Sequence, residues 1–466
     1  PTVADSVPML TRLLEATAQP LTLGELTLQV SASIGVTFYP QTDEVDADQL
    51  LRQADQAMYQ AKLAGKNRYH VFDNEQDRSV RGHHESLDHI RLALERNEFV
   101  LHYQPKVNMR TGQVVGAEAL IRWQHPERGL LPPAVFLPVI EDHALSIDVG
   151  DWVIDTALAQ MAQWRTAGLR LPVSVNIGAR QLQDPQFVSK LAAHLAAHPS
   201  VAPTDLELEL LETSALEDVV RISKVIEACK HLGVHFSLDD FGTGYSSLTY
   251  LKRLPVGLLK IDQSFVRDML DDPDDLAILD GVIGLARAFG RRVIAEGVET
   301  IEHGEMLLQL GCEHAQGYGV ARPMPADRIP AWANSWQPDE MWKQAHVVPH
   351  DTLPVLNACV EHRAWVNALE AYFTGERETP PPLHPDHCNF GKWLRDASLL
   401  HPQSVQLLQT IDSEHRVFHH TAEDLCARHV QRTAGAAPVN MLTLHAQSTA
   451  LIALLKQFIG QCGPRP

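Results

Sequence analysis

The stretch LELELLETSALEDVVRISKVIEACKHLGVHFSLDD occupies residues 206–240 and carries the pattern that decides the fold. It predicts a strand over Leu206–Leu210, an amphipathic helix, and a second strand over His235–Leu238. The same alternation runs through residues 89–335, with further strands predicted at Phe99–Tyr103, Val173–Ile177, Leu258–Ile261 and Val293–Ala295. Strand–helix units repeated over about 250 residues predict an α/β fold, a TIM-like (β/α) barrel.

Polar residues stand at the ends of these predicted strands, where barrel enzymes place their chemistry. They are Glu118, Asn176, Glu209, Asp239, Asp240, Lys260 and Glu296. Carboxylate and amide oxygens are the ligands that Mg²⁺ and Mn²⁺ prefer. The adjacent Asp239 and Asp240 could each serve a different ion of a two-metal pair. Any one of these acids could instead be a helix N-cap, but that reading does not explain the whole set.

The residues around these positions form motifs of a known family. Glu118-Ala119-Leu120-Ile121-Arg122-Trp123 is similar to the signature of the EAL phosphodiesterases, and the resemblance runs from about Leu92 to Pro325. The other matching motifs are Tyr103-Gln104-Pro105, Val175-Asn176-Ile177, Glu209 with Glu212, Asp239-Asp240-Phe241-Gly242-Thr243-Gly244, Lys260-Ile261-Asp262, Glu296-Gly297-Val298-Glu299 and Gln316-Gly317-Tyr318. Leu211 and the stretch Gly319–Arg322 depart from the family pattern, and neither is a ligand position.

The resemblance implies hydrolysis of cyclic di-GMP to linear pGpG with two Mg²⁺ or Mn²⁺ ions. The first ion would be held by Glu118, Asn176, Glu209 and Asp239, and the second by Asp239, Asp240 and Glu296. Such ions lower the pKa of a bridging water, which then attacks phosphorus in line. Lys260 would orient that water or stabilise the charge of the transition state.

The resemblance also implies roles for residues that do not bind metal. Gln104, Leu120, Arg122 and Gln316 would contact the substrate, with Arg122 clamping the scissile phosphate. Glu212 and Glu299 would anchor loops, and Glu212 would tether the loop Asp239–Gly244. A non-catalytic cyclic di-GMP receptor is the main alternative. It predicts the loss of at least one of the metal or lysine positions, and none is lost.

Residues 1–73 read as helix, hairpin, helix and strand, with a β-rich stretch Leu28–Tyr39 and helical spacing over Ala47–Ala64. Ser33-Ile34-Gly35-Val36 and the stretch Ala54–Lys62 resemble the second half of a GGDEF diguanylate cyclase domain. Lys62 and Lys66 match phosphate-contacting positions of that family, but its Gly-Gly-Asp/Glu-Glu-Phe turn does not occur in this sequence. We therefore expect an α+β remnant without cyclase activity, which packs or forms dimers, with both lysines solvated.

Helical patterns continue from Met341 to the end of the chain, and four potential metal ligands stand among them: His362, Cys388, His415 and His419. His415 and His419 are four residues apart and share one helix face. Three imidazoles and one thiolate suit a tetrahedral Zn²⁺ site. The chain has 24 histidines, so a solvated histidine-rich surface is the alternative.

The stretch from about Val355 to Leu425 resembles the chemoreceptor zinc-binding (CZB) domain, a four-helix bundle. The resemblance rests on His362 near Trp365, Cys388 before Gly391 and Trp393, and the later histidine pair. It implies one Zn²⁺ held by those three histidines and the cysteine. Such a site could sense zinc or, through its thiolate, an oxidant. A permanent structural zinc is the competing interpretation of this site. For the whole protein, a zinc-buffering scaffold is a third interpretation, beside the phosphodiesterase and the non-catalytic receptor.

Composition limits the remaining choices. A net charge of −19 disfavours a nucleic-acid polymer as partner. Six widely spaced cysteines favour a reducing, cytosolic setting, and the family resemblance implies that this is the bacterial cytoplasm. No apolar run is long enough to span a membrane. The chain opens on Pro1 rather than methionine, so a preceding sensor or membrane tether stays open.

We expect four parts and a homodimer, the latter by resemblance. The parts are a truncated GGDEF-like segment over 1–73, a charged connector over 74–90, the EAL barrel over 91–337 and the CZB-like helical domain over 338–466.

Overall fold

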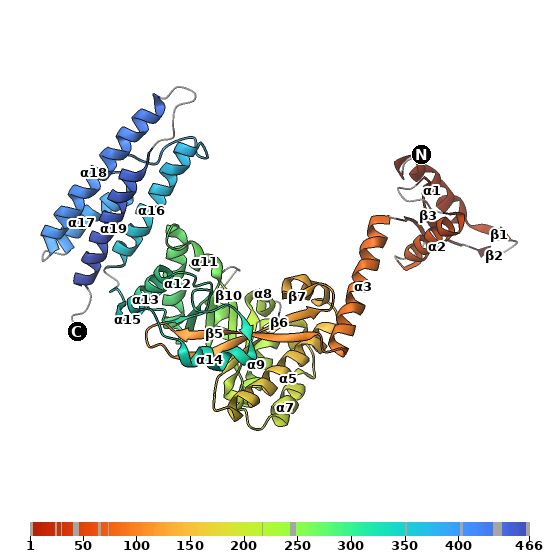
Figure 1. Cartoon of the computed structure of the whole chain (residues 1–466). Coiled ribbons are helices and arrows are strands. Elements are labelled where there is room, and N and C mark those ends of the chain that lie inside the picture. Colours follow the sequence, from red (N-terminus) through yellow and green to blue (C-terminus); the bar gives the residue numbers. More distant parts are fainter. Residues whose placement is uncertain are drawn as a thin grey trace. The chain divides into compact units, whose positions relative to one another are not determined.

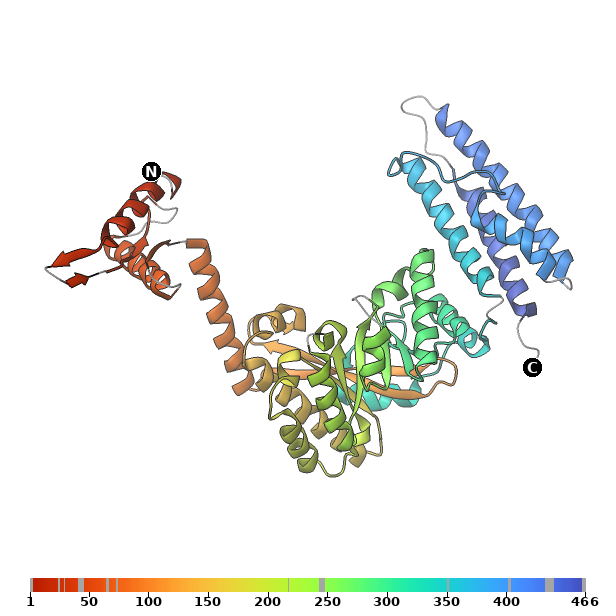
Figure 2. The same cartoon turned by 180° about the vertical axis from the view of Figure 1, so that it is seen from behind.

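The computed structural model describes residues 3–23, 26–28, 30–40, 46–63, 67–72, 74–216, 218–242, 248–349, 352–400, 404–431 and 440–462. It divides into two compact units, Pro1–Leu92 and Ala93–Pro466, and each is described by itself. Figures 1 and 2 show the elements from opposite sides.

The first unit has the α+β character that the sequence predicts. Its elements are α1 (Val3–Thr17), the antiparallel pair β1 (Leu21–Leu23) and β2 (Leu26–Leu28), the parallel pair β3 (Ser33–Val36) and β4 (Arg68–Val71), and α2 (Ala47–Leu63). A side chain at Gly35 would collide with the α2 backbone, since its Cβ would lie 1.8 Å from Ala54 O. Glycine in the Ser-Ile-Gly-Val motif therefore allows β3 to pack directly on α2.

The stretch expected to be a charged connector is helical. Helix α3 runs over Asn74–Glu95 and buries Leu87, Ile90 and Ala93 near its end. These three apolar residues recur at three-residue spacing, which is the period of one helix face. The first half of α3 is rich in charged residues, and this apolar pattern was therefore not predicted from the sequence.

A closed barrel forms the centre of the second unit. Its eight strands, counted among the described residues, are β5 (Phe99–Asn108), β6 (Val114–His125), β8 (Val173–Ile177), β9 (Leu206–Leu211), β10 (His235–Phe241), β11 (Leu258–Ile261), β12 (Arg292–Ala295) and β13 (His314–Ala315). They pair in this order, and β5 closes the ring by pairing with both β6 and β13. Two short strands, β7 (Gly129–Leu131) and β14 (Met324–Pro325), pair with β6 and β5.

Strand β5 is antiparallel to both of its barrel neighbours, whereas the strands from β6 to β13 run parallel. The connection from β5 to β6 is only residues 109–113, and so short a link joins only antiparallel strands. The fold is thus a TIM-like barrel whose first strand is reversed. The strands predicted at Val173–Ile177 and Leu258–Ile261 are confirmed, and that predicted from Phe99 continues to Asn108.

Helices cover the outside of the barrel (Figure 1). The longer ones are α5 (Leu145–Thr166), α7 (Phe187–Ala197), α9 (Val219–His231), α12 (Pro273–Ala288) and α13 (Ile301–Leu310). Shorter ones are η1 (Pro133–Val135), α4 (Leu137–Ile140), α6 (Ala179–Leu182), η2 (Pro203–Asp205), α8 (Glu212–Leu216), α10 (Leu248–Arg253), α11 (Gln263–Asp268), η3 (Ala326–Arg328), α14 (Ile329–Ser335) and α15 (Glu340–Gln344). On β8, Val173, Val175 and Ile177 are buried and alternate with Ser174 and Asn176, which therefore face the barrel interior.

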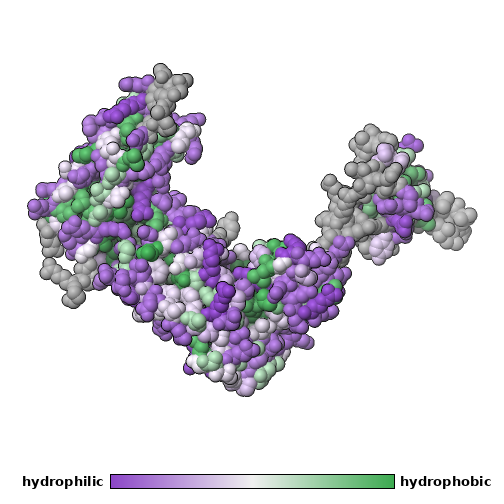
Figure 3. All heavy atoms as spheres, viewed as in Figure 1, coloured by the Kyte–Doolittle hydropathy of each residue, from purple (hydrophilic) through white to green (hydrophobic). Residues whose placement is uncertain are grey.

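Four helices form a bundle after the barrel: α16 (Leu353–Thr374), α17 (Asn389–Leu400), α18 (Val405–Val430) and α19 (Leu442–Cys462). Each packs on two others, in the cycle α16, α17, α18, α19. Leu369, Phe418, Ala422 and Leu444 are fully buried between them. Hydrophilic residues cover most of the surface visible in Figure 3. Within the described ranges, no helix is both long and apolar enough to cross a bilayer.

Candidate active site and candidate zinc site

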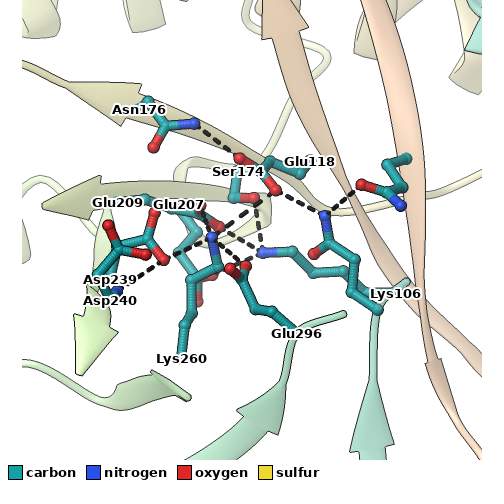
Figure 4. A network of polar contacts seen from close by, with 12 residues as sticks. Lys106, Glu118, Ser174, Asn176, Glu207, Glu209, Asp239, Asp240, Lys260 and Glu296 are labelled. Atoms are coloured by element: carbon teal, nitrogen blue, oxygen red, sulfur yellow. Dashed lines mark hydrogen bonds and ion pairs between the residues drawn. The ribbon is translucent and has the colours of Figure 1, made fainter. Parts of the chain in front are cut away.

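The carboxyl ends of the barrel strands bring the predicted site residues together (Figure 4). Parallel strands in register present their carboxyl ends at one rim, so residues distant in sequence meet there. Glu118 lies on β6, Asn176 on β8, Glu209 on β9, Asp239 and Asp240 on β10, Lys260 on β11 and Glu296 directly after β12.

Lys260 lies at the centre of this group. Its Nζ is 2.9 Å from Asp239 Oδ1, 2.6 Å from Glu296 Oε1 and 3.7 Å from Glu118 Oε2, and it forms a further ion pair with Glu209. The lysine is 1% exposed. One ammonium group therefore faces four carboxylates in a nearly dry environment, which leaves an excess of negative charge. Such a donor set suits additional cations.

Two observations fit divalent ions to this site. Asp239, Asp240 and Glu296 place carboxylate oxygens within 4.8 Å of one another. Gln316 Nε2 donates to Glu118 Oε2 at 2.6 Å and to Gln104 Oε1 at 3.0 Å. Its own Oε1 is buried and has no hydrogen-bond partner among the described residues. A buried oxygen of that kind needs an ion, a water or a substrate group.

The protein environment shifts the pKa values of these acids in different directions. Burial raises the pKa of Glu296 to about 8, since the charge of Asp239 adds to burial and Lys260 only partly opposes it. Burial and the adjacent Asp239 raise the pKa of Asp240 to about 7. Burial also acts on Glu209, but Lys106 and Lys260 outweigh it and bring its pKa to about 2. A cation must therefore displace protons from Glu296 and Asp240 when it binds.

The remaining predicted residues lie around this centre. Leu120 and Arg122 follow Glu118 at alternate positions of β6, so all three face the same side of the strand. Burial lowers the pKa of Arg122, whose Nη1 donates to Ile121 O at 2.8 Å. The exposed Glu299 has its backbone N–H 3.5 Å from His303 Nδ1.

Strand β10 contains a strained residue close to its end. Asp240 has a φ of +54°, which is rare outside glycine. The N–H of Gly242 donates to Glu212 Oε2 at 3.1 Å. Thr243 and Gly244, which complete the predicted loop, lie outside the described residues, and so does Lys66 of the first segment. Lys62 is exposed.

A second buried lysine, Lys106, was not predicted. It lies on β5, donates to Ser174 Oγ at 2.6 Å, and forms ion pairs with Glu209 and Glu207. The predicted strand ended at Tyr103, whereas β5 continues to Asn108. Alternation with Gln104 along a longer strand is the signal that would have placed Lys106 inside the barrel.

The bundle brings together three of the four predicted zinc ligands. One ligand atom each of Cys388, His415 and His419 lies within 4.8 Å of the others, and His415 Nε2 is 3.2 Å from Cys388 Sγ. His419 Nδ1 lies 2.6 Å from Leu383 O and would donate to it, which leaves Nε2 as the atom that can bind a metal. His362 is not part of this close cluster, and its ring centroid lies 4.5 Å from that of Phe418.

Protonation and hydrogen bonding in the bundle also suit a metal. Burial, and then the neighbouring His419, lowers the pKa of both His362 and His415 to about 3, so both rings are neutral at pH 7. Neutral imidazole is the form that binds Zn²⁺. His362 Nε2 and His415 Nδ1 are buried without hydrogen-bond partners in the described part of the chain. Burial raises the pKa of Cys388, so its thiol must lose a proton to a metal ion.

Comparison with known families agrees with this geometry. The model of the EAL domain matches residues 87–323, more than half of the chain. This chain belongs to the EAL family. Models of the diguanylate cyclase GGDEF domain and of the chemoreceptor zinc-binding domain match residues 2–68 and 362–425. The three predicted family resemblances are thus confirmed, in the predicted order.

Curated EAL relatives are substantially similar in sequence. "Bifunctional diguanylate cyclase/cyclic di-GMP phosphodiesterase MucR" of Pseudomonas aeruginosa is 40% identical over 327 residues, which are 70% of this chain and 47% of that protein. "Cyclic di-GMP phosphodiesterase PdeR" of Escherichia coli is 38% identical over 324 residues, 70% of this chain and 49% of that one. The chain spans about half the length of these relatives.

Solved structures show the same fold. The structure titled "PaMucR Phosphodiesterase, c-di-GMP complex" is 43% identical with a TM-score of 0.51, covering 53% of this chain and 99% of that one. The EAL enzyme Bd1971 in its "cAMP and cyclic-di-GMP bound form" is 31% identical with a TM-score of 0.54, covering 62% of this chain and 76% of that one.

Proposed function

We propose that this EAL protein hydrolyses cyclic di-GMP to linear pGpG. The convergence of four carboxylates on the buried Lys260 at the carboxyl rim of the barrel carries the proposal. Membership of the EAL family supports it, as do a related phosphodiesterase structure titled as a c-di-GMP complex and relatives named as cyclic di-GMP phosphodiesterases.

Two Mg²⁺ or Mn²⁺ ions complete the proposed site. Glu118, Asn176, Glu209 and Asp239 would hold one, and Asp239, Asp240 and Glu296 the other. Two observations support this assignment: the close approach of the last three carboxylates, and Gln316 Oε1, which has no hydrogen-bond partner in the described part of the chain. Bound ions of this kind supply Lewis-acid charge and a water of lowered pKa.

The side chains of the protein would then orient substrate and stabilise charge. Lys260 holds a proton throughout, because the surrounding carboxylates outweigh the effect of burial and raise its pKa. Its ammonium group would donate to the attacking water or to the phosphoryl oxygens as negative charge develops. Arg122 would contact the scissile phosphate, with Gln104, Leu120 and Gln316 placed around it. Glu212 would hold the loop after β10, and Glu299 would anchor a second loop.

The test is incubation of the protein with cyclic di-GMP and Mg²⁺ or Mn²⁺, followed by chromatography for pGpG. We expect product with wild type and none with Glu118→Ala, because that variant leaves the first ion under-coordinated. Glu127→Ala, which changes an exposed acid after the same strand, is the matched control and should retain activity. Binding of cyclic di-GMP without pGpG formation by wild type would instead favour the receptor alternative.

We further propose that the bundle binds one Zn²⁺ through His362, Cys388, His415 and His419, and that occupancy or thiol oxidation regulates hydrolysis. Helix α16 carries His362 and also packs on the barrel helix α12. Lys456 Nζ lies 2.7 Å from Glu305 Oε2, and Asn367 Nδ2 lies 3.3 Å from Asp271 Oδ1. These contacts give the bundle a direct physical connection to the barrel. A homodimer in the bacterial cytoplasm completes the proposal, and sedimentation analysis tests the dimer.

A further inference from the structure

Lys106 occupies a position inside the barrel that is normally filled by branched apolar side chains. The residue is 5% exposed, and its Nζ has three polar partners: Ser174 Oγ at 2.6 Å, Glu207 Oε1 at 3.5 Å and Glu209 Oε1. A buried ammonium group is retained only where such partners offset its desolvation. The question is whether this lysine serves the fold or the site.

The two oxygens of Glu209 are divided between two lysines. Lys106 binds Oε1, whereas Lys260 binds Oε2 on the side of Asp239 and Glu296. Figure 4 shows Lys106 and Lys260 reaching this carboxylate from different strands. Only one oxygen of Glu209 therefore faces the carboxylate cluster.

The space on the other side of Lys106 shows why it matters that this lysine holds one oxygen of Glu209. A cavity of about 240 Å³ lies at the amino ends of the parallel strands, and its lining includes Lys106, Ser174, Glu207, Arg292 and His314. Its lining mixes these polar groups with apolar side chains such as Val173 and Leu258, and it is large enough for water. Without Lys106, the Glu209 carboxylate could turn away from the site and be solvated or bound by other groups there.

We propose that Lys106 is a positioning residue, which holds Glu209 by Oε1 so that Oε2 alone is presented to a divalent cation. The inference rests on the proposed function, in which Glu209 is a metal ligand. Outer residues of this kind orient the ligand they contact and set metal affinity without touching the ion.

The experiment is a titration of Lys106→Met with Mn²⁺, followed by electron paramagnetic resonance of the free ion. Asp239→Ala measures Mn²⁺ bound outside the barrel site, which is subtracted. We expect barrel Mn²⁺ affinity to fall roughly 10- to 100-fold. Removing a positive charge by itself favours cation binding, so weaker binding reports the lost orientation of Glu209 rather than the lost charge.

Glu207→Gln is the matched control, because it removes the other carboxylate partner of Lys106 and leaves the contact with Glu209 in place. It should leave Mn²⁺ affinity within about twofold, well below the change expected for an outer-shell contact. Unchanged or tighter Mn²⁺ binding by Lys106→Met would overturn the inference, and a lowered melting temperature with that result would assign the lysine to the fold.

If Lys106→Met does not fold, Ser174→Ala tests the same idea with both charges kept, because it removes only the hydrogen bond that directs Lys106. Weaker Mn²⁺ binding supports the inference, and unchanged affinity contradicts it. Wild type that binds no Mn²⁺ in the barrel would overturn the proposed function and this inference together. Wild type that binds Mn²⁺ no better than Lys106→Met would overturn this inference alone.

Discussion

At the scale of single residues, Lys260 is both buried and charged, and only suitable partners around it make this possible. It is buried, yet it stays protonated because the carboxylates around it outweigh the effect of burial on its pKa. In the described structure Lys260 and Lys106 together neutralise part of the acidic cluster, while the proposed reaction uses Lys260 for charge that develops only in the transition state.

We predict that Lys260→Ala will bind cyclic di-GMP nearly as wild type but turn it over at least roughly 100-fold more slowly, as when a transition-state donor is lost. The measurements are substrate affinity in Ca²⁺, intended to slow chemistry, and kcat in Mn²⁺. The exposed Lys343, which pairs only with Glu340 among the described residues, provides the control Lys343→Ala. Weakened binding with an unchanged kcat would contradict the assigned role.

The raised pKa values of Glu296 and Asp240 predict pH-dependent metal binding. With pKa values of about 8 and about 7, both acids hold protons as the pH falls through those values, and a cation needs the ionised forms. Affinity for Mg²⁺ should therefore rise with pH between about 6 and 9 and level off above the higher pKa. Calorimetric titration of wild type across this range measures it, and Glu296→Gln should remove the upper part of the dependence. A flat profile would contradict it.

At the scale of elements, helix α18 displays the difference between a buried ligand face and a solvated one. His415 and His419 are four residues apart and buried, whereas His420 is adjacent in sequence and its side chain is 76% exposed. Because successive residues of a helix point in different directions, His419 lies on the buried face and the adjacent His420 on the exposed face.

We predict that His419→Ala will lose the bound Zn²⁺ while His420→Ala keeps one equivalent. His419 belongs to the cluster with Cys388 and His415, whereas His420 points into solvent. Metal analysis of dialysed proteins gives the stoichiometry, and thermal unfolding shows whether each variant is folded. Equal zinc content in the two variants would favour the solvated histidine-rich surface.

At the scale of the whole molecule, the bundle and the barrel belong to one compact unit and are joined through α16 and α19. A ligand in the bundle can change catalysis only if it binds two states of the enzyme with different affinity. A coupling of about 1–3 kcal/mol would correspond to roughly 5- to 150-fold in affinity.

We predict that removing Zn²⁺ from wild type will change the rate of pGpG formation at fixed Mg²⁺, and that Cys388→Ser will not respond. The variant matters because excess Zn²⁺ can also compete with Mg²⁺ in the barrel, and it separates the two effects. The measurement is pGpG formation by both proteins with a chelator and after zinc is restored. A wild-type rate that is independent of bound zinc would make the ion a structural component.

The sequence alone determined those features of the protein that depend on residues close together in the chain, namely the strands and the short motifs. Val173–Ile177 and Leu258–Ile261 were predicted as strands because apolar β-formers report local burial. Glu118, Asp239, Lys260 and Glu296 were found because a barrel places chemistry at strand ends, and each lies in its own short motif.

Only the tertiary structure decided which of these residues touch. Lys106 meets Glu209 across 103 positions of sequence because β5 enters the ring antiparallel and extends beyond its predicted end. His362 lies outside the close cluster of Cys388, His415 and His419, and its ring packs against Phe418. Periodicity specifies which way a side chain faces on its own element. Distances between elements are set by barrel closure and helix packing, which no local pattern encodes.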